Sequence, residues 1–258
     1  MTDVTSTKNI GLVQNDKIEW SFWLGLVFFV VVISLISVGG WRLFDRMMAN
    51  EAAPISTIQV SGEMPYTNKA DITKALAGSN VGNFFQLDVN NLQKRLEALP
   101  WVKSASVRKQ WPSQLSIYLV DHVPAAVWNQ DHLLSETGDV FEAEQSRVKV
   151  RLPHFYGPEG SEDIALNNFK HLNGMLALSQ MGISEISLSA RYAWRLTLND
   201  GVVLNLGREE RVERVQRFID VYPQILEHKN ENQQVNYVDL RYDTGVAVGW
   251  KQAEDERV

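Results

Sequence analysis

The chain has 258 residues, 45% of them hydrophobic, which is enough to build the core of one or two domains and too many for a disordered chain. It has no cysteine, which excludes disulfides, thiolate nucleophiles, zinc fingers and iron–sulfur clusters. The 25 Lys and Arg against 31 Asp and Glu give a net charge of −6, which argues against a general nucleic-acid binder, because such proteins need basic residues to neutralise phosphates.

An uncharged segment runs from Trp20 to Trp41 and is closed by Arg42. At about 1.5 Å of rise per residue, a helix of this length crosses the hydrocarbon core of a bilayer, which is about 30 Å thick. Trp20, Trp23 and Trp41 suit the two membrane interfaces. The sequence therefore predicts a transmembrane helix over 20–41 rather than a signal peptide, whose apolar region would be shorter and preceded by basic residues.

The charges that flank this helix do not decide its orientation, because two lysines precede it and two arginines follow it. The tail before it, residues 1–19, is too short to fold. We therefore expect the bulk of the protein on the other side of the membrane, joined to the helix by a polar linker over 42–53.

Residues 54–122 are predicted to form a small domain with the order strand, helix, helix, strand, strand. Apolar residues recur at helical spacing after Asp88, and they alternate between Leu115 and Leu119 as in a strand with one buried face. The predicted elements are a strand over 55–61, a helix opened by Asn68 and Asp71, a helix capped by Asp88 and ended by Pro100, and strands over 101–109 and 114–121.

Pro124 marks a boundary, after which the pattern changes to short strands with helices between them. Strands are predicted over 125–129, 132–134, 140–142, 147–152, 183–189, 194–198, 202–206, 236–242 and 246–250. One helix is predicted to begin at the acidic residues that follow Ser161 and to be closed by Gly182, and another is predicted over 209–222.

No pattern for catalysis or metal binding stands out. The five histidines, at 122, 132, 154, 171 and 228, are scattered and include no HExxH motif. Phosphate-binding glycine loops and the GxSxG elbow are absent too. Glu209 and Glu210 lie beside Arg208 and Arg211 at a helix start, where ordinary ion pairing explains them. We therefore expect no enzymatic activity, no cofactor and no metal.

The C-terminal residues offer a surface for recognition. The strand over 246–250 is short and neutral, and if it lies at a sheet edge its unpaired N–H and C=O groups invite a partner strand. Tyr237, Arg241, Tyr242 and Trp250 are of the types that most often anchor interfaces. A second interpretation stays open, because Tyr242 and Trp250 are in phase with apolar neighbours and fit a place in the core equally well.

Two longer stretches are more specific. One runs from Leu99-Pro-Trp-Val-Lys through Arg108-Lys-Gln-Trp-Pro-Ser113 to Trp128, and the other is Tyr237-Val-Asp-Leu-Arg-Tyr-Asp-Thr-Gly-Val-Ala-Val-Gly-Trp250. Together with the apolar helix and Leu152-Pro-His-Phe-Tyr-Gly-Pro-Glu-Gly160, they resemble the FtsQ/DivIB family of bacterial cell-division proteins in its gammaproteobacterial form. The resemblance covers nearly the whole chain.

The resemblance implies an α+β protein with a single N-terminal transmembrane helix. A POTRA domain over 54–122 would be followed by a larger mixed β domain with flanking helices over 123–251 and a tail over 252–258. It also implies a single-pass type II protein of the inner membrane, concentrated at the division septum. The short tail would be cytoplasmic and the bulk of the chain periplasmic.

The function that the resemblance implies is that of a non-enzymatic scaffold of the divisome. Such a protein binds FtsB and FtsL, is recruited through FtsK, and helps to control septal peptidoglycan synthesis by FtsW and FtsI. In the family, FtsB adds a strand to the last strand of the β domain. The matching positions here are Tyr237, Arg241, Tyr242, Thr244, Gly245, Gly249 and Trp250, together with Arg191, whose surroundings differ more.

Two further expectations complete this interpretation. Thr244 stands where related sequences can have Ser, which is a mild departure from the family, and the second POTRA strand, 102–109, is the expected contact for recruitment. The alternative function is that of a POTRA-containing component of an outer-membrane translocation system. Such proteins carry a barrel of strands of about ten residues, for which the residues after Pro124 leave no room. A periplasmic hydrolase or transferase would need a nucleophile or metal site that the sequence does not offer.

Overall fold

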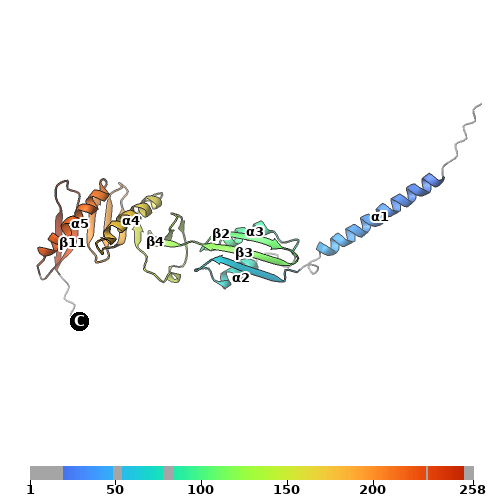
Figure 1. Cartoon of the computed structure of the whole chain (residues 1–258), viewed down its shortest axis with the longest axis horizontal. Helices are drawn as coiled ribbons and strands as arrows, with labels where there is room; N and C mark the ends of the chain where they lie inside the picture. The colour runs from blue at the N-terminus through green and yellow to red at the C-terminus, as the bar shows by residue number, and fades with distance from the viewer. Residues whose placement is uncertain (1–19, 49–53, 78–83, 231, 253–258) are drawn as a thin grey trace, which may run out of the picture.

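The computed structural model describes residues 20–48, 54–77, 84–230 and 232–252. They form a long apolar helix, a three-stranded sheet and a nine-stranded sheet that follow one another along an elongated molecule, with the helix at one end (Figure 1). The α+β class with an N-terminal apolar helix is therefore confirmed. The predicted N-terminal tail, 1–19, lies outside the described residues.

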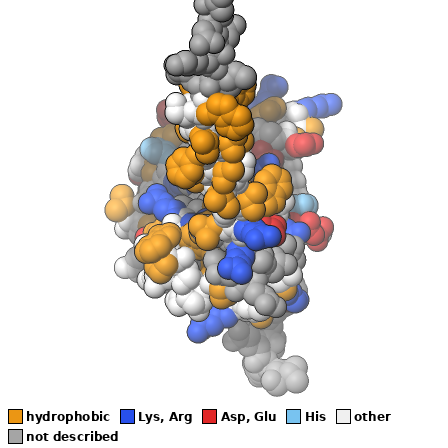
Figure 2. Space-filling view, turned by 90° about the vertical axis from the view of Figure 1, so that its right-hand side faces the viewer, with side chains coloured by type: hydrophobic (Ala, Val, Ile, Leu, Met, Phe, Trp, Pro, Cys, Tyr) orange, Lys and Arg blue, Asp and Glu red, His pale blue; other side chains and the backbone are white. Residues whose placement is uncertain are grey.

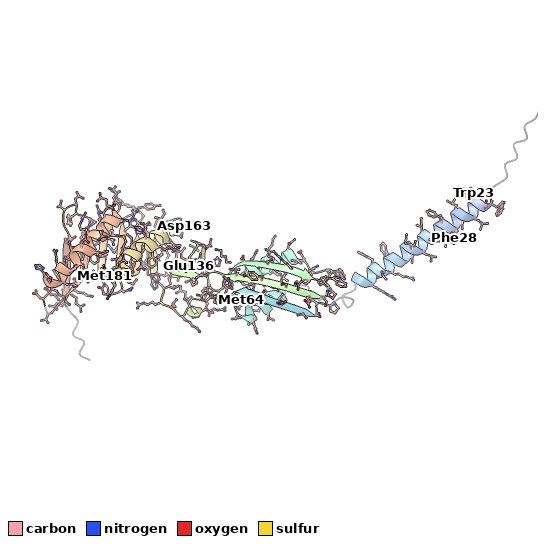
Figure 3. All side chains as sticks on the ribbon, in the orientation of Figure 1. Trp23, Phe28, Met64, Glu136, Asp163 and Met181 are labelled. Atoms are coloured by element: carbon pink, nitrogen blue, oxygen red, sulfur yellow. The ribbon has the colours of Figure 1, made fainter. Side chains whose placement is uncertain are left out.

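Helix α1 (Trp20–Met48) is long and apolar enough, over Trp20–Arg46, to cross a membrane. Its side chains, among them Trp23 and Phe28 in Figure 3, project into the surroundings and are not covered by the rest of the protein. The helix continues seven residues beyond the predicted end at Trp41, because the segment up to Met48 contains neither Pro nor Gly to stop it.

The three-stranded sheet is built in the predicted order of strand, helix, helix, strand, strand. Its strands lie in the order β1-β3-β2, with β1 parallel and β2 antiparallel to the central β3. The predicted cap of α3 is confirmed, since Asp88 Oδ1 accepts hydrogen bonds from the N–H groups of Asn90 and Asn91. The elements are β1 (Thr57–Glu63), α2 (Lys69–Ala77), α3 (Val89–Glu97), β2 (Val102–Gln110) and β3 (Gln114–Asp121).

One face of this sheet is covered by the two helices. Leu92 and Leu96 of α3 lie fully buried against Leu115, Ile117 and Leu119, the inward-facing residues of β3. The alternation seen in the sequence of β3 is therefore the burial pattern of the strand.

The larger sheet has the strand order β12-β11-β10-β9-β8-β7-β4-β5-β6. Helix α4 packs against β8 and α5, and α5 packs against β10, so the two helices cover the part of the sheet that carries the C-terminal strands (Figure 1). The strands are β4 (Pro124–Trp128), β5 (His132–Ser135), β6 (Val140–Phe141), β7 (His154–Tyr156), β8 (Ile183–Leu188), β9 (Trp194–Leu198), β10 (Val203–Gly207), β11 (Gln233–Asp239) and β12 (Ala247–Gln252), and the helices are η1 (Gln145–Arg147), α4 (Glu162–Ala177) and α5 (Arg211–Glu227).

Two predicted elements of this domain are wrong in place or kind. The strand predicted over 147–152 is instead the end of η1 followed by an irregular segment, and the strand in this region is β7. At the start of this segment the Arg147 side chain reaches back to the first unit, where it donates hydrogen bonds to Asp71 of α2 and to the carbonyl of Tyr66. Helix α4 ends at Ala177 rather than at Gly182. Gly182 instead immediately precedes β8, where it lies against the side chain of Asn199.

Two boundaries near the C-terminus also differ from prediction. Helix α5 continues through Pro223 to Glu227, because the buried Ile225 in its last turn packs against the core. Strand β11 ends at Asp239, three residues before the predicted end at 242. Beyond it the chain turns, since Asp239 Oδ1 accepts the N–H of Arg241 at 3.1 Å.

The two sheets are joined by a small packed cluster. Trp101 of the first unit lies buried with Val127 and Leu133 of the second, and its ring meets Tyr66 and Phe141 at centroid distances of 4.4 and 5.5 Å. The connection is therefore a packed joint rather than only a covalent linker.

Candidate functional site

Strand β12 forms one outer edge of the nine-stranded sheet. Its inner side pairs antiparallel with β11, and in the part of the chain that the structure describes no strand pairs with its outer side. A strand in this position presents a row of N–H and C=O groups to solvent. The sequence analysis expected the C-terminal strand to invite a partner strand if it lay at a sheet edge. The structure places it at an edge.

The backbone of β12 lies close to an aromatic ring of β11. Gly249 is opposite Tyr237 in the register, and a side chain at Gly249 would collide with that ring. Tyr237 therefore covers the glycine while remaining 41% exposed itself. Only glycine fits this position without displacing the ring.

The structure decides where the aromatic residues of this edge lie. Trp250 is half-buried and packs, together with Val246 and Val248, against the main core. Tyr242 is 58% exposed, because it lies beyond the end of β11 and no longer follows the alternation of that strand. Of the two interpretations left open by the sequence, a place against the core holds for Trp250, and a place on the surface holds for Tyr242.

A groove of about 460 Å³ lies beside β12, between the strand and the second half of α5. Val221 and Ile225 line it from the helix, Val248 and Trp250 line it from the strand, and the turn at 244–245 closes one end. The groove is mainly apolar and runs next to the open edge. It could accept an apolar side chain of a strand that pairs with β12.

A second pocket, of about 450 Å³, is rich in arginine. It brings together residues from the β8–β9 turn, from the start of α5 and from the end of β11, and its basic residues are Arg191, Arg208, Arg214 and Arg241. Glu209 is the acidic residue in its lining. The excess of positive charge suits a carboxylate from a partner.

Two of these arginines are held in place by the protein itself. Arg214 is nine-tenths buried, and its Nη1 donates a hydrogen bond of 2.6 Å to the carbonyl of Leu206. Arg241 Nε donates to Asp239 Oδ1 at 2.9 Å, and these hydrogen bonds hold the pKa of the buried Asp239 below its usual value. The pocket therefore keeps its positive charge in a defined geometry.

The close approach of the two side chains depends on Gly207. It has a positive φ of 72°, and a Cβ atom there would lie 2.9 Å from Arg214 Nη1 and 3.3 Å from Arg241 Cγ. Glycine is therefore favoured both by the backbone conformation and by the space available.

The predicted contact residues fall into one region of the surface. Seven of them lie on β11, on β12 or on the turn between them, and Arg191, although distant in sequence, lines the same pocket as Arg241. Sequence reasoning missed Arg208 and Arg214. Glu210 pairs with Arg214 at 3.7 Å, one turn further along the helix, rather than with its neighbours in sequence. A signal existed, since Arg214 lies four residues before the buried Phe218, next to the apolar face of α5.

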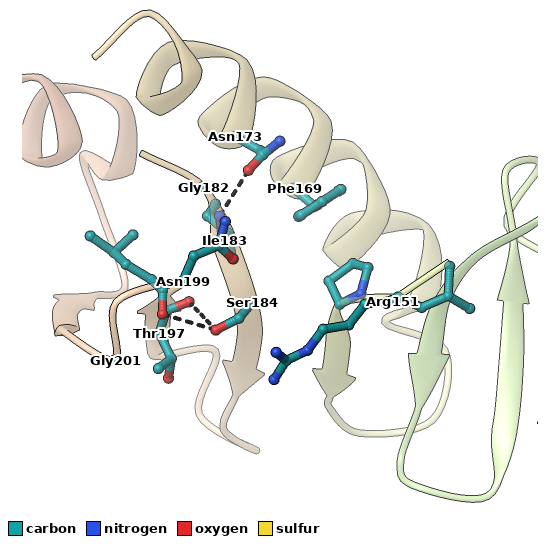
Figure 4. A pocket seen from close by; sticks show the side chains of 12 residues that line it. Arg151, Phe169, Asn173, Gly182, Ile183, Ser184, Thr197, Asn199 and Gly201 are labelled. Carbon is teal, nitrogen blue, oxygen red and sulfur yellow. Dashed lines mark hydrogen bonds between the residues drawn. The ribbon is translucent and has the colours of Figure 1, made fainter. Parts of the chain in front are cut away.

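A cavity of about 640 Å³ lies elsewhere and contains none of the predicted residues (Figure 4). It is formed by α4, by β8 and β9, and by the segment around Arg151. Its polar groups bond to one another: Asn173 Oδ1 accepts the N–H of Ile183 at 2.9 Å, and Ser184 Oγ donates to the carbonyl of Thr197 at 3.1 Å. Among the described residues no group of three His, Asp or Glu is placed to hold a metal ion.

Comparisons with known proteins match both sheets. Residues 126–241 match the family "Cell division protein FtsQ/DivIB, C-terminal", and residues 53–122 match "POTRA domain, FtsQ-type". The cell division protein FtsQ of Escherichia coli K12 is 40% identical over 230 residues, which covers 88% of this chain and 83% of that protein. FtsQ of Shewanella oneidensis is 38% identical over 241 residues, with 93% and 91% covered, and FtsQ of Vibrio cholerae is 37% identical over 227 residues, with 88% and 86% covered.

Proposed function

Because this chain belongs to the FtsQ/DivIB family of bacterial cell-division proteins, we propose that it is a non-enzymatic scaffold of the divisome that binds FtsB and FtsL through the edge of β12. Its α1 anchors it in the inner membrane as a single-pass protein, and its two sheets lie in the periplasm at the division septum. Through these contacts it helps to control peptidoglycan synthesis by FtsW and FtsI.

The observation that carries the proposal is the open edge of β12, with an apolar groove beside it and an arginine-rich pocket at the end of the neighbouring strand β11. A partner strand that pairs with β12 gains main-chain hydrogen bonds along up to six residues, Ala247–Gln252. The apolar groove beside α5 takes an apolar side chain, and the arginine pocket takes an acidic one. Main-chain pairing supplies affinity, while the two pockets supply specificity.

Recruitment through FtsK is assigned to the smaller sheet. Its strand β2, which contains the predicted contact over 102–109, is an outer strand in the order β1-β3-β2 and is therefore accessible along one side. This contact is separate from the β12 edge, so one chain can hold a recruiting partner and FtsB at the same time. The alternative role in outer-membrane translocation lacks comparable support, because the match over 126–241 is to the C-terminal domain of cell-division proteins.

The proposal is tested by reversing one charge in the arginine pocket. Arg191→Glu in the full-length protein, reconstituted in lipid nanodiscs, should weaken binding of the FtsB ectodomain by about tenfold or more, because a like charge would face the acidic partner residue. Arg191 is exposed at a turn, so the melting temperature should stay unchanged. The affinity is measured by titration with labelled FtsB.

Arg151→Glu provides the matched control, since it makes the same charge change at the exposed rim of the unrelated cavity in Figure 4. It should bind FtsB with the affinity of the wild type. Wild-type affinity for Arg191→Glu, or equal losses in both variants, would contradict an acidic contact at the pocket.

A further inference from the structure

The hairpin turn between β2 and β3 exposes a tryptophan. Trp111 is 81% exposed, more than Trp20 at 74% or Trp41 at 77%, which lie on the apolar helix α1. The tryptophans of the two sheets, Trp101, Trp128, Trp194 and Trp250, are buried or half-buried. Trp111 therefore resembles the membrane-helix tryptophans in exposure, and indole rings are enriched where a bilayer meets water.

This turn lies at the end of the smaller sheet from which the chain leads to α1. The N–H of Ser56, just before β1, donates to the carbonyl of Ser113 at 2.9 Å, and the hydroxyls of the two residues lie 2.8 Å apart. Ser56 follows Met48, the last residue of α1, by only eight residues, which span at most about 28 Å when fully extended. The turn is thus tied within a short distance of the helix end.

The length of α1 places that helix end near the membrane surface. Its 29 residues correspond to about 43 Å of helix, whereas the hydrocarbon core is about 30 Å thick and the headgroup layers bring the total to about 40 to 45 Å. The helix therefore ends close to the outer limit of the headgroups. The turn of the hairpin lies at the end of the smaller sheet that faces α1 (Figure 1).

Basic and aromatic side chains lie beside the tryptophan. Lys109 Nζ lies 5.6 Å from the ring centroid of Phe84 and donates to the carbonyl of Phe85 at 3.3 Å, and the Phe85 ring is 40% exposed. Arg108, the preceding residue of β2, is exposed too. In Figure 2, which looks along the molecule from the side of α1, Lys and Arg side chains, and some Asp and Glu side chains, appear around the apolar helix in projection. Cations next to an exposed aromatic group suit a layer of anionic phosphates.

We propose that the β2–β3 turn contacts the lipid headgroup layer of the same bilayer that α1 spans. Trp111 inserts its indole ring among the headgroups, and Lys109 and Arg108 are attracted to the net negative charge of the headgroup layer. The smaller sheet is then attached to the membrane at two points, by the linker and by the turn. Its long axis is directed away from the membrane surface. The larger sheet, with its β12 edge, is thereby presented at a fixed height.

The absence of cysteine from the sequence allows a direct test with a single spin label. Gln110→Cys places a nitroxide next to Trp111, and Leu178→Cys, at a residue 89% exposed at the end of α4, places one on the other sheet as a control. The full-length variants are reconstituted into vesicles of phosphatidylethanolamine and phosphatidylglycerol. Accessibility to oxygen, which concentrates in lipid, and to a water-soluble nickel chelate is measured by power-saturation electron paramagnetic resonance.

We expect a higher ratio of oxygen to nickel accessibility at position 110 than at position 178. Adding Trp111→Ala to the Gln110→Cys variant should lower the ratio to the value at 178 without changing the melting temperature, because the indole ring is not part of the core. Equal ratios at 110 and 178 in the unmodified background would overturn the proposal. An unchanged ratio in vesicles of phosphatidylcholine alone would overturn the role given to Lys109 and Arg108.

Discussion

Two outer strands, β2 of the smaller sheet and β12 of the larger sheet, differ in how their free edges are protected. In β2 the N–H of Ala105 is already taken, because it donates to Glu97 Oε1 of α3 at 3.3 Å. Lys103, Arg108 and Lys109 add charge along the same strand. Strand β12 carries one charged residue, Lys251, and in the described residues its backbone bonds to β11 alone.

Charged side chains and occupied N–H groups are the usual devices that keep an edge strand from pairing with another chain. The smaller sheet uses both devices at β2, whereas β12 uses neither along most of its length. An unprotected edge is a liability for a protein that has no partner for it. The comparison therefore favours β12 as the edge that accepts a whole strand, and it favours β2 as an edge for side-chain contacts.

The aromatic residues at β12 should give the largest effect. Tyr242→Ala removes the exposed ring that we propose as an anchor, so affinity for the FtsB ectodomain should fall by about 2 kcal/mol, or about 30-fold, at an unchanged melting temperature. Trp250→Ala should lower affinity and melting temperature together, because its ring also packs against the core. Titration and thermal melting of the same samples separate the two cases.

Tyr118→Ala is the matched control on the smaller sheet, since Tyr118 is 46% exposed on β3. It should leave FtsB binding unchanged. Undiminished binding by both β12 variants would remove this edge as the site, and a lower melting temperature for Tyr242→Ala would show that its ring supports the fold.

Local patterns predicted much of this site. The alternation over 246–250 located the last strand, and the spacing after Asp88 located α3 together with its cap. These features depend on residues close together in the chain, where periodicity and capping chemistry act directly. The end of β11 could not be found this way, because the apolar phase continues to Tyr242 while the hydrogen bonds between Arg241 and Asp239 turn the chain earlier.

The arginine pocket could not be predicted from local patterns, because it is formed by residues far apart in the sequence. Arg191, Arg214 and Arg241 come from three elements, and only the pairing of β8 with β9 and of β10 with β11 brings them together. No spacing in the sequence encodes such a meeting. Arg214 was not singled out in the sequence, and the fold buries it against the carbonyl of Leu206.

The dependence of β12 on Gly249 gives the next effect. In Gly249→Val the new side chain would collide with the ring of Tyr237, which should cost about 1 to 3 kcal/mol of unfolding free energy and separate β12 from β11. Gly245→Val makes the same chemical change where no atom lies within 4 Å, and it should be tolerated. Urea unfolding of both variants checks this, and equal stabilities would show that Tyr237 moves aside without cost.

Removing the acceptor that protects the β2 edge should have a smaller effect on stability. Glu97→Ala leaves the N–H of Ala105 without its acceptor, which should lower the unfolding free energy by about 1 kcal/mol and accelerate hydrogen exchange at that amide. Glu97→Gln retains a carbonyl acceptor and should preserve most of the protection. Exchange at Ala105 that is equally slow in all three proteins would show that Glu97 does not protect the β2 edge.

The weakest expected effect is the response of the β12 region to acid. Because Arg241 lowers the pKa of Asp239 in the folded state, the ionised carboxylate stabilises the fold at pH values above the unfolded pKa of about 3.9, and this stabilisation is lost as the pH falls through the lower folded value. The contribution should be small, because the Arg241 side chain is 62% exposed and solvent screens the pair.

The unfolding free energies of the wild type and Asp239→Asn should therefore differ at pH 6, and the difference should shrink below about pH 4 as Asp239 takes up its proton. The control is Arg241→Gln, which removes the cation that favours the ionised form. In that background, Asp239→Asn should show a much weaker dependence on pH. A difference that stays constant from pH 6 to pH 2 would mean that Asp239 acts through its shape and hydrogen bonds rather than through its charge.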